Sequence, residues 1–82
     1  MNTFSRIEKF MHDQILAGLG KKTLGPDEDL LDQGIIDSLG IMKLIVFIED
    51  TFNLKIDDGE IIPENFQSLN SMVTFVQQKD AA

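Results

Sequence analysis

The sequence predicts an all-α fold, a small bundle of helices that forms a single domain over residues 1–82. Apolar residues recur at spacings of three and four along three stretches, which is the period of a helix with one buried face. No stretch alternates between apolar and polar residues for long enough to indicate a strand, and no repeat or linker divides the chain. A chain of 82 residues has room for one compact core.

The first predicted helix covers Phe4 to Leu19. Either Thr3 or Ser5 can cap its beginning, and Gly18 and Gly20 would end it. The apolar residues of this helix share one face, so we expect that face in the core: Phe4, Ile7, Phe10, Met11, Ile15 and Leu19.

Residues 21–36 are predicted to form a long loop, because Gly25-Pro26 and a cluster of acidic residues interrupt any helical period. A connection of this length more often has a function or an anchor. Its apolar residues can anchor it on the helices: Leu24, Leu30, Leu31, Ile35 and Ile36. The acidic residues do not match a calcium-binding loop, because counting from Asp27 puts Asp32 at the sixth position, where an EF-hand needs glycine. We therefore expect solvated charge here and no metal site.

The second predicted helix covers Ser38 to Phe52. Placing its residues about 100° apart puts one apolar arc toward the core: Ile41, Leu44, Ile45, Ile48 and Phe52. Three further apolar residues lie on an adjacent arc: Leu39, Met42 and Val46. Two acidic residues follow farther along the helix: Glu49 and Asp50. We interpret this second group as a surface for partner proteins. The alternative is that its apolar members pack under the long loop.

Residues 53–67 are mixed in character and can hold at most one or two turns of helix, with Pro63 in a first-turn position. Ser68 is placed to cap a last helix, and residues from Gln77 onward are expected to fray. The last helix has a buried face formed by Leu69, Met72, Val73 and Val76.

The chain is strongly acidic, with 14 acidic and 7 basic residues and a formal net charge of −7. This charge disfavours nucleic acid and anionic lipid as partners and favours capture by basic protein surfaces. One histidine, no cysteine and no tyrosine leave few side chains for acid–base or nucleophilic chemistry, so we do not expect an enzyme. We expect a cytoplasmic protein, because the chain lacks cysteine, a bilayer-spanning apolar run and a secretory signal. We also expect a monomer.

One short run, Gly34 to Gly40, joins the loop to the second helix and places Asp37 and Ser38 at the helix start. Aspartate and serine are both good N-caps, because a side-chain oxygen can accept a hydrogen bond from an unpaired N–H of the first turn. A second interpretation is that Ser38 carries a covalent group. A phosphodiester there would lie at the positive end of the helix dipole, among free backbone donors.

The order of these features resembles the phosphopantetheine-dependent carrier proteins along nearly the whole chain. The shared features are a loop, Asp37-Ser38-Leu39, an apolar helix ending in phenylalanine, a short mixed segment and a terminal helix. The resemblance implies an antiparallel four-helix bundle with a short third helix and a long loop between helices 1 and 2. It also implies that 4′-phosphopantetheine from coenzyme A is esterified to Ser38, and that Asp37 helps a phosphopantetheinyl transferase bind its metal ion and cofactor. The thiol of the cofactor would then hold an acyl group as a thioester.

The same resemblance implies that partner enzymes dock on the second helix. The implied docking residues are Leu39, Met42, Lys43, Val46, Glu49 and Asp50. The implied partners are the transferase, an acyl- or aminoacyl-adenylating ligase, and downstream acyl-transferring or condensing enzymes. Lys43 stands where carriers of fatty acid synthesis commonly have an acid, and a reversed charge favours a different partner.

Two short runs look more like the discrete carriers charged by a separate adenylating ligase, which include the D-alanyl carrier proteins. These runs are Gly34-Ile35-Ile36-Asp37, with Gly40 after Leu39, and Ile62-Pro63-Glu64-Asn65-Phe66. We therefore expect an acyl carrier of a specialised pathway, in fatty acid, polyketide or nonribosomal peptide biosynthesis. An aminoacyl or D-alanyl carrier is the alternative.

A hypothesis from another class is a helical adaptor or calcium-responsive module that carries no cofactor. In that case Ser38 is only a helix cap, and Leu39, Met42 and Val46 form a groove for a peptide. Attachment of a cofactor at Ser38 separates this hypothesis from the carrier.

Overall fold

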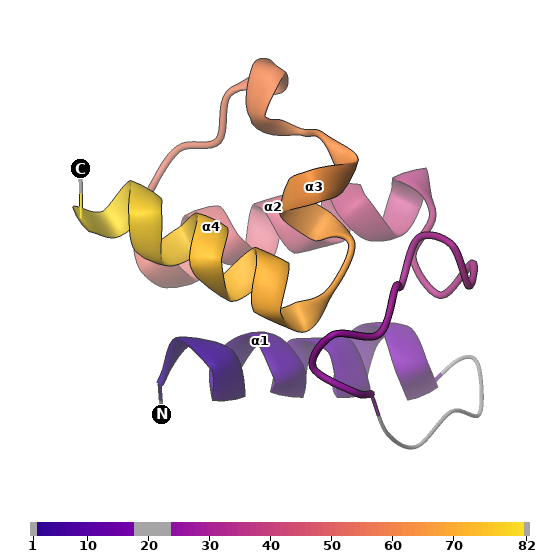
Figure 1. The fold of residues 1–82 in the computed structure, drawn as a ribbon. Coiled ribbons are helices and arrows are strands. Elements are labelled where there is room, and N and C mark those ends of the chain that lie inside the picture. The colour runs from indigo at the N-terminus through magenta and orange to yellow at the C-terminus, as the bar shows by residue number, and fades with distance from the viewer. Residues whose placement is uncertain (1, 18–23, 82) are drawn as a thin grey trace.

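The computed structural model describes residues 2–17 and 24–81. These residues form helices joined by loops, with no strand among them (Figure 1). Their radius of gyration of 11.7 Å matches the ~12 Å of a compact chain of this length. The all-α prediction is confirmed. The elements in chain order are α1 (Thr3–Phe10), η1 (Met11–Leu16), α2 (Ser38–Phe52), η3 (Asp58–Glu60), α3 (Pro63–Phe66) and α4 (Leu69–Ala81).

The hydrophobic core lies where α4 packs against α1, α2 and α3 (Figure 1). Phe66 of α3 and Phe75 of α4 pack with ring centroids 5.6 Å apart, so Phe75 fills the core. The largest fully buried side chains come from every one of these helices, from η1 and from the loop before α2: Phe66, Ile7, Met11, Leu16, Leu30, Leu44, Ile48, Leu69, Met72 and Val76.

Helix α1 begins at a cap other than the two that the sequence suggested. The Asn2 side chain accepts a hydrogen bond of 2.8 Å from the Ser5 N–H. The predicted caps, Thr3 and Ser5, are therefore wrong, because both residues already lie inside the helix. The predicted end of the helix, from Gly18 to Gly20, lies outside the described residues.

Helix α1 continues into η1, a π-helical segment closed by a hydrogen bond from the Ala17 N–H to the His12 carbonyl. A π-helix places about one more residue in each turn than an α-helix, so the buried face shifts by one position. Leu16 therefore follows Met11 in the core and is fully buried, whereas Ile15 is only partly buried. The prediction placed Ile15 on the buried face and omitted Leu16, because it assumed an unbroken α-helical period.

The loop before α2 has no helix in its described part, residues 24–37, and is held against the core. The Leu30 N–H donates to the Gln67 carbonyl over 2.7 Å, and the Asn70 N–H donates to the Pro26 carbonyl over 3.0 Å. These bonds fasten the loop to the start of α4. The predicted anchors are confirmed, three of them buried and two at the core edge: Leu24, Leu30 and Ile36, then Leu31 and Ile35.

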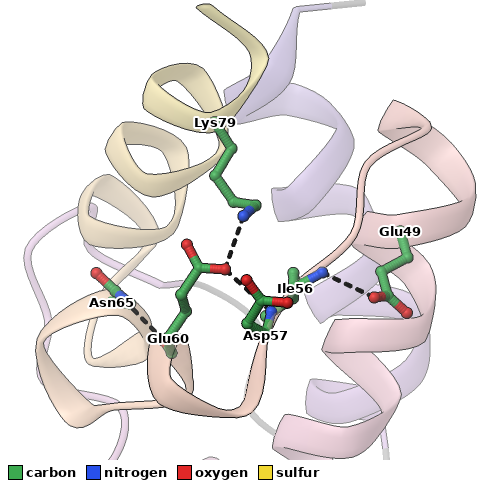
Figure 2. Close-up of polar contacts among 6 residues, drawn as sticks. All are labelled: Glu49, Ile56, Asp57, Glu60, Asn65 and Lys79. Atoms are coloured by element: carbon green, nitrogen blue, oxygen red, sulfur yellow. Dashed lines mark hydrogen bonds and ion pairs between the residues drawn. The ribbon is translucent and has the colours of Figure 1, made fainter. Parts of the chain in front are cut away.

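Glu60 ties the segment between α2 and α3 to the last helix (Figure 2). Its carboxylate accepts hydrogen bonds from the Lys79 ammonium at 2.7 Å and from the Asp57 N–H at 3.0 Å, and its carbonyl accepts one from Asn65. The Lys79 hydrogen bond, followed by that from Asp57, lowers the pKa of the Glu60 carboxyl below its ordinary value. Helix α4 is helical past Gln77, where the sequence predicted fraying, and the Lys79 contact accounts for the difference.

The caps of the last two helices agree with their predictions. Pro63 occupies the first turn of α3, where its missing N–H leaves no intrahelical bond unmade. The Ser68 hydroxyl accepts a hydrogen bond of 3.1 Å from the Ser71 N–H at the start of α4.

Candidate functional site

The start of α2 is capped by Asp37. Asp37 has an extended backbone, and its Oδ1 accepts a hydrogen bond of 2.9 Å from the Gly40 N–H. Its carbonyl accepts the hydrogen bond from Ile41 that opens the helix. Asp37 thus fills the N-cap position that the sequence left open between two residues. Ser38 is the first residue inside the helix and has no capping role.

The Ser38 side chain is exposed and makes no hydrogen bond within the described part of the chain. The N–H groups of Ser38 and Leu39 also lack an acceptor there, since Asp37 bonds only to the third N–H of the helix. A hydroxyl and two backbone donors therefore point out together at the positive end of a 15-residue helix. This arrangement suits a hydroxyl that will carry an anionic group.

Gly40 and Ile36 set the approach of the loop to α2. Gly40 is buried, and a Cβ at this position would lie 3.1 Å from Ile36 Cγ2 and 3.8 Å from Ile15 Cδ1. Because Gly40 has no side chain, Ile36 can pack closely against the first turn of α2. Gly34 turns the loop with a φ of 72°, a conformation that glycine adopts at no steric cost. The run around Ser38 is thus positioned by two glycines and one buried isoleucine.

Next to Ser38, α2 presents an apolar surface to solvent. Leu39 is 63% exposed, and Met42 and Val46 are each 57% exposed. The structure therefore leaves all three uncovered, and the alternative that they pack beneath the long loop is wrong. An exposed apolar cluster on one helix is typical of an interaction surface.

The charged residues predicted for docking have different positions. Lys43 and Asp50 are exposed on α2. Glu49 is partly buried, and its Oε2 accepts a hydrogen bond of 2.9 Å from the Ile56 N–H (Figure 2). Glu49 therefore holds the segment after α2 and presents less of its charge to a partner than Asp50 does.

An aromatic contact that the sequence did not predict lies beside this surface. Phe10 of α1 and Phe47 of α2 stack with ring centroids 4.4 Å apart and planes 19° from parallel. Phe47 also meets Phe52 edge to face at 6.4 Å. Phe47 lies on neither of the two arcs predicted for α2. It follows Lys43 by four residues, so Phe47 and Lys43 lie above one another on the helix.

The described residues contain no group of three or more histidine, cysteine or acidic side chains arranged to hold a metal ion. No helix in the described ranges has the length and apolar character needed to cross a membrane.

The fold and the site define a helical scaffold that presents an exposed serine hydroxyl at a helix start, with no hydrogen bond to any residue in the described ranges. Residues 15–76, about three quarters of the chain, match the family described as phosphopantetheine attachment site. The chain therefore belongs to the family of phosphopantetheine-dependent carrier proteins. The family resemblance drawn from the sequence is confirmed, and such carriers bear a covalently attached 4′-phosphopantetheine and are not themselves enzymes.

Similar relatives include the D-alanyl carrier proteins of Streptococcus equi subsp. zooepidemicus and Streptococcus pyogenes serotype M1. Each is 40% identical to this chain over 52 residues, which make up 63% of the chain and 66% of the relative. The match thus spans just under two thirds of the relatives' length. It agrees with the D-alanyl-carrier-like features of the sequence.

Proposed function

We propose that Ser38 Oγ carries 4′-phosphopantetheine and that the protein holds an acyl group as a thioester on this arm for delivery to other enzymes. One observation supports the position above all: the side chain of Ser38, the first residue of α2, is exposed and makes no hydrogen bond to the described residues. The site fits the cofactor, because the free N–H groups of Ser38 and Leu39 can meet the phosphodiester at the positive end of the helix.

Attachment joins the arm to the serine by one exchange of bonds. Ser38 Oγ bonds to the phosphorus that bears the pantetheine of coenzyme A, and the bond from that phosphorus to the second phosphate breaks. Adenosine 3′,5′-bisphosphate leaves, and the serine proton passes to a base of the transferase. Asp37 uses Oδ1 for the cap, which leaves Oδ2 free to face the metal ion of the transferase.

The proposal includes the finer architecture and the partners. The helices form an antiparallel four-helix bundle in a single domain, with α3 as its short third helix. A separate acyl- or aminoacyl-adenylating ligase loads the arm, and acyl-transferring or condensing enzymes unload it. These enzymes dock on the exposed surface of Leu39, Met42 and Val46, with Lys43 and Asp50 setting the charge at its rim. The protein works as a monomer in the cytoplasm, since its donor, coenzyme A, is an intracellular metabolite.

A D-alanyl or other aminoacyl cargo is the second candidate, and the 40% identity to D-alanyl carrier proteins favours it. The two candidates share the site and the arm and differ only in the group on the thiol. The intact mass of the protein isolated from its host, with its thioester preserved, separates them. An added alanyl or other aminoacyl mass supports the second candidate, and the mass of an acyl group without an amine supports the first.

The attachment is tested with coenzyme A and a broad-specificity phosphopantetheinyl transferase. We expect the wild-type chain to gain the mass of one phosphopantetheinyl group and Ser38→Ala to gain none. Ser5→Ala is the matched control, because Ser5 lies on α1 and its side chain makes no hydrogen bond to the residues that the structure describes. An unmodified wild type under conditions that modify another carrier would overturn the proposal.

A further inference from the structure

We propose that the arm on Ser38 folds back along a groove between α1–η1 and α2, so that its thiol lies beside the stacked Phe10 and Phe47. This inference rests on the proposed attachment at Ser38. We call this feature the α1–α2 groove, and it consists of three adjoining hollows on the surface of the molecule.

The hollows follow one another along α2. The first, of about 220 Å³, is lined by Asp37, Leu39 and Gly40, the chain neighbours of Ser38, and also by Lys43. The second, of about 510 Å³, is lined by Lys43 and Phe47, and the third, of about 360 Å³, by Phe47 and Thr51. Neighbouring hollows therefore share a lining residue of α2, and an arm attached at the start of this helix would meet them in this order.

The two walls of the groove are rows of residues spaced by four, which lie above one another on a helix. On α2 the row is Leu39, Lys43, Phe47 and Thr51. On α1 and η1 it is Arg6, Phe10 and Gln14, and Gln14 lines all three hollows. The rings of Phe10 and Phe47, stacked with their centroids 4.4 Å apart, join the two walls and line both the second and the third hollow.

The length of the arm matches the path. About fourteen bonds separate Ser38 Oγ from the thiol, and at the reach of an extended peptide they span ~16 Å. Residues of a helix rise 1.5 Å each, so a fully extended arm brings the thiol level with a residue about eleven positions after Ser38. That level lies between Phe47 and Thr51, the two residues of α2 that line the third hollow. A group on the thiol would then lie in the third hollow, near Arg6 and Thr51.

The chemistry of the walls suits the arm along its length. Lys43 makes no ion pair within the described part of the chain and stands beside the first hollow, where the negative phosphodiester would lie. The second hollow has Met42, Val46 and Phe47 for the geminal methyl groups of pantetheine, and Gln14 for its amides.

The test uses the holo-protein, whose modification is first verified by mass. We expect nuclear Overhauser contacts between the geminal methyl groups of the arm and the Phe47 ring and Val46 methyls. Because the chain has no cysteine, the arm provides the single thiol, and its alkylation by iodoacetamide reports how often it is free. A thiol that is covered for two thirds of the time reacts about threefold more slowly than free pantetheine.

Two glutamate substitutions on exposed apolar residues complete the test. Val46→Glu puts a charge in the second hollow and should restore the alkylation rate to that of free pantetheine. Ile62→Glu is the matched control, since Ile62 is 41% exposed and lines none of the three hollows, and it should keep the slow rate.

The outcomes distinguish this inference from the proposed attachment. Failure to gain the mass overturns the attachment itself. A holo-protein whose arm shows contacts to Ile62 but not to Phe47, or whose thiol reacts as fast as free pantetheine, overturns only the placement in the α1–α2 groove.

Discussion

Asp37 and Ser38 have different roles at the start of α2. Asp37 satisfies the third N–H of the helix through a 2.9 Å hydrogen bond, and the Ser38 hydroxyl has no partner among residues 2–17 and 24–81. A serine that capped the helix would have its oxygen engaged with the backbone, whereas a serine one position later is free to react. The aspartate is therefore what makes the serine available. Because Asp37 is the cap, Ser38 does not have the capping role that the hypothesis of a cofactor-free adaptor gives to it.

Substitutions at Asp37 separate its capping role from its charge. Asp37→Ala should lower the free energy of unfolding by about 1 kcal/mol, the usual cost of losing an N-cap, whereas Asp37→Asn should stay close to wild type because asparagine also caps. Both variants should slow the transfer of phosphopantetheine, since neither offers a carboxylate to the metal ion of the transferase. Urea denaturation and mass-monitored initial rates measure the two effects. An asparagine variant modified at the wild-type rate would contradict the second role.

At the scale of elements, the sequence predicts those features that depend on helical period and local capping. It predicts the bounds of α2 and the Ser68 cap, because each depends on neighbours in the chain. It also predicts the anchoring leucines of the loop, because apolar residues within a polar loop need a core to pack against. The π-helical turn at η1 has no sequence signal of this kind, so its shift of the buried face to Leu16 was missed. The stacking of Phe10 on Phe47 also joins residues far apart in the sequence, and only the packing of the helices reveals it.

The shift of the buried face at η1 predicts different losses of stability for substitutions of two adjacent residues, Leu16 and Ile15. Leu16→Ala should lower the free energy of unfolding by about 2–5 kcal/mol, as expected for a fully buried leucine. Ile15→Ala should have a clearly smaller effect, because Ile15 is only partly buried. Urea denaturation of the two variants measures the difference. The opposite order would mean that the first helix keeps an α-helical period through these residues.

At the scale of the whole molecule, polar contacts fasten segments that the core holds less tightly. The Glu60–Lys79 pair ties the segment after α2 to α4, and the hydrogen bonds of Asn70 tie the long loop to the start of α4. These contacts hold both segments that flank α2 against α4. We propose that this attachment serves docking, because each partner would then find the arm at the same place relative to the exposed surface of Leu39, Met42 and Val46.

The Glu60–Lys79 pair predicts a dependence of stability on pH. The pKa of the Glu60 carboxyl is lowered in the folded state, so the ionised carboxylate stabilises the fold. This stabilisation is fully present above the ordinary pKa of a glutamate and is lost as pH falls through the lowered value. Lys79→Met should reduce the decrease in the free energy of unfolding between neutral and acidic pH, which urea denaturation measures. Lys9→Met is the control, because the Lys9–Asp13 pair is largely exposed and should contribute little. Equal pH profiles for the wild type and Lys79→Met would contradict this account.

Fragmentation mass spectrometry of the modified protein shows whether phosphopantetheine is attached at Ser38. We expect one phosphopantetheinyl group per chain, with every fragment that contains residue 38 bearing the added mass and no other fragment bearing it. A group located on any other serine or threonine, or a chain that takes up no group, would contradict the attachment at Ser38.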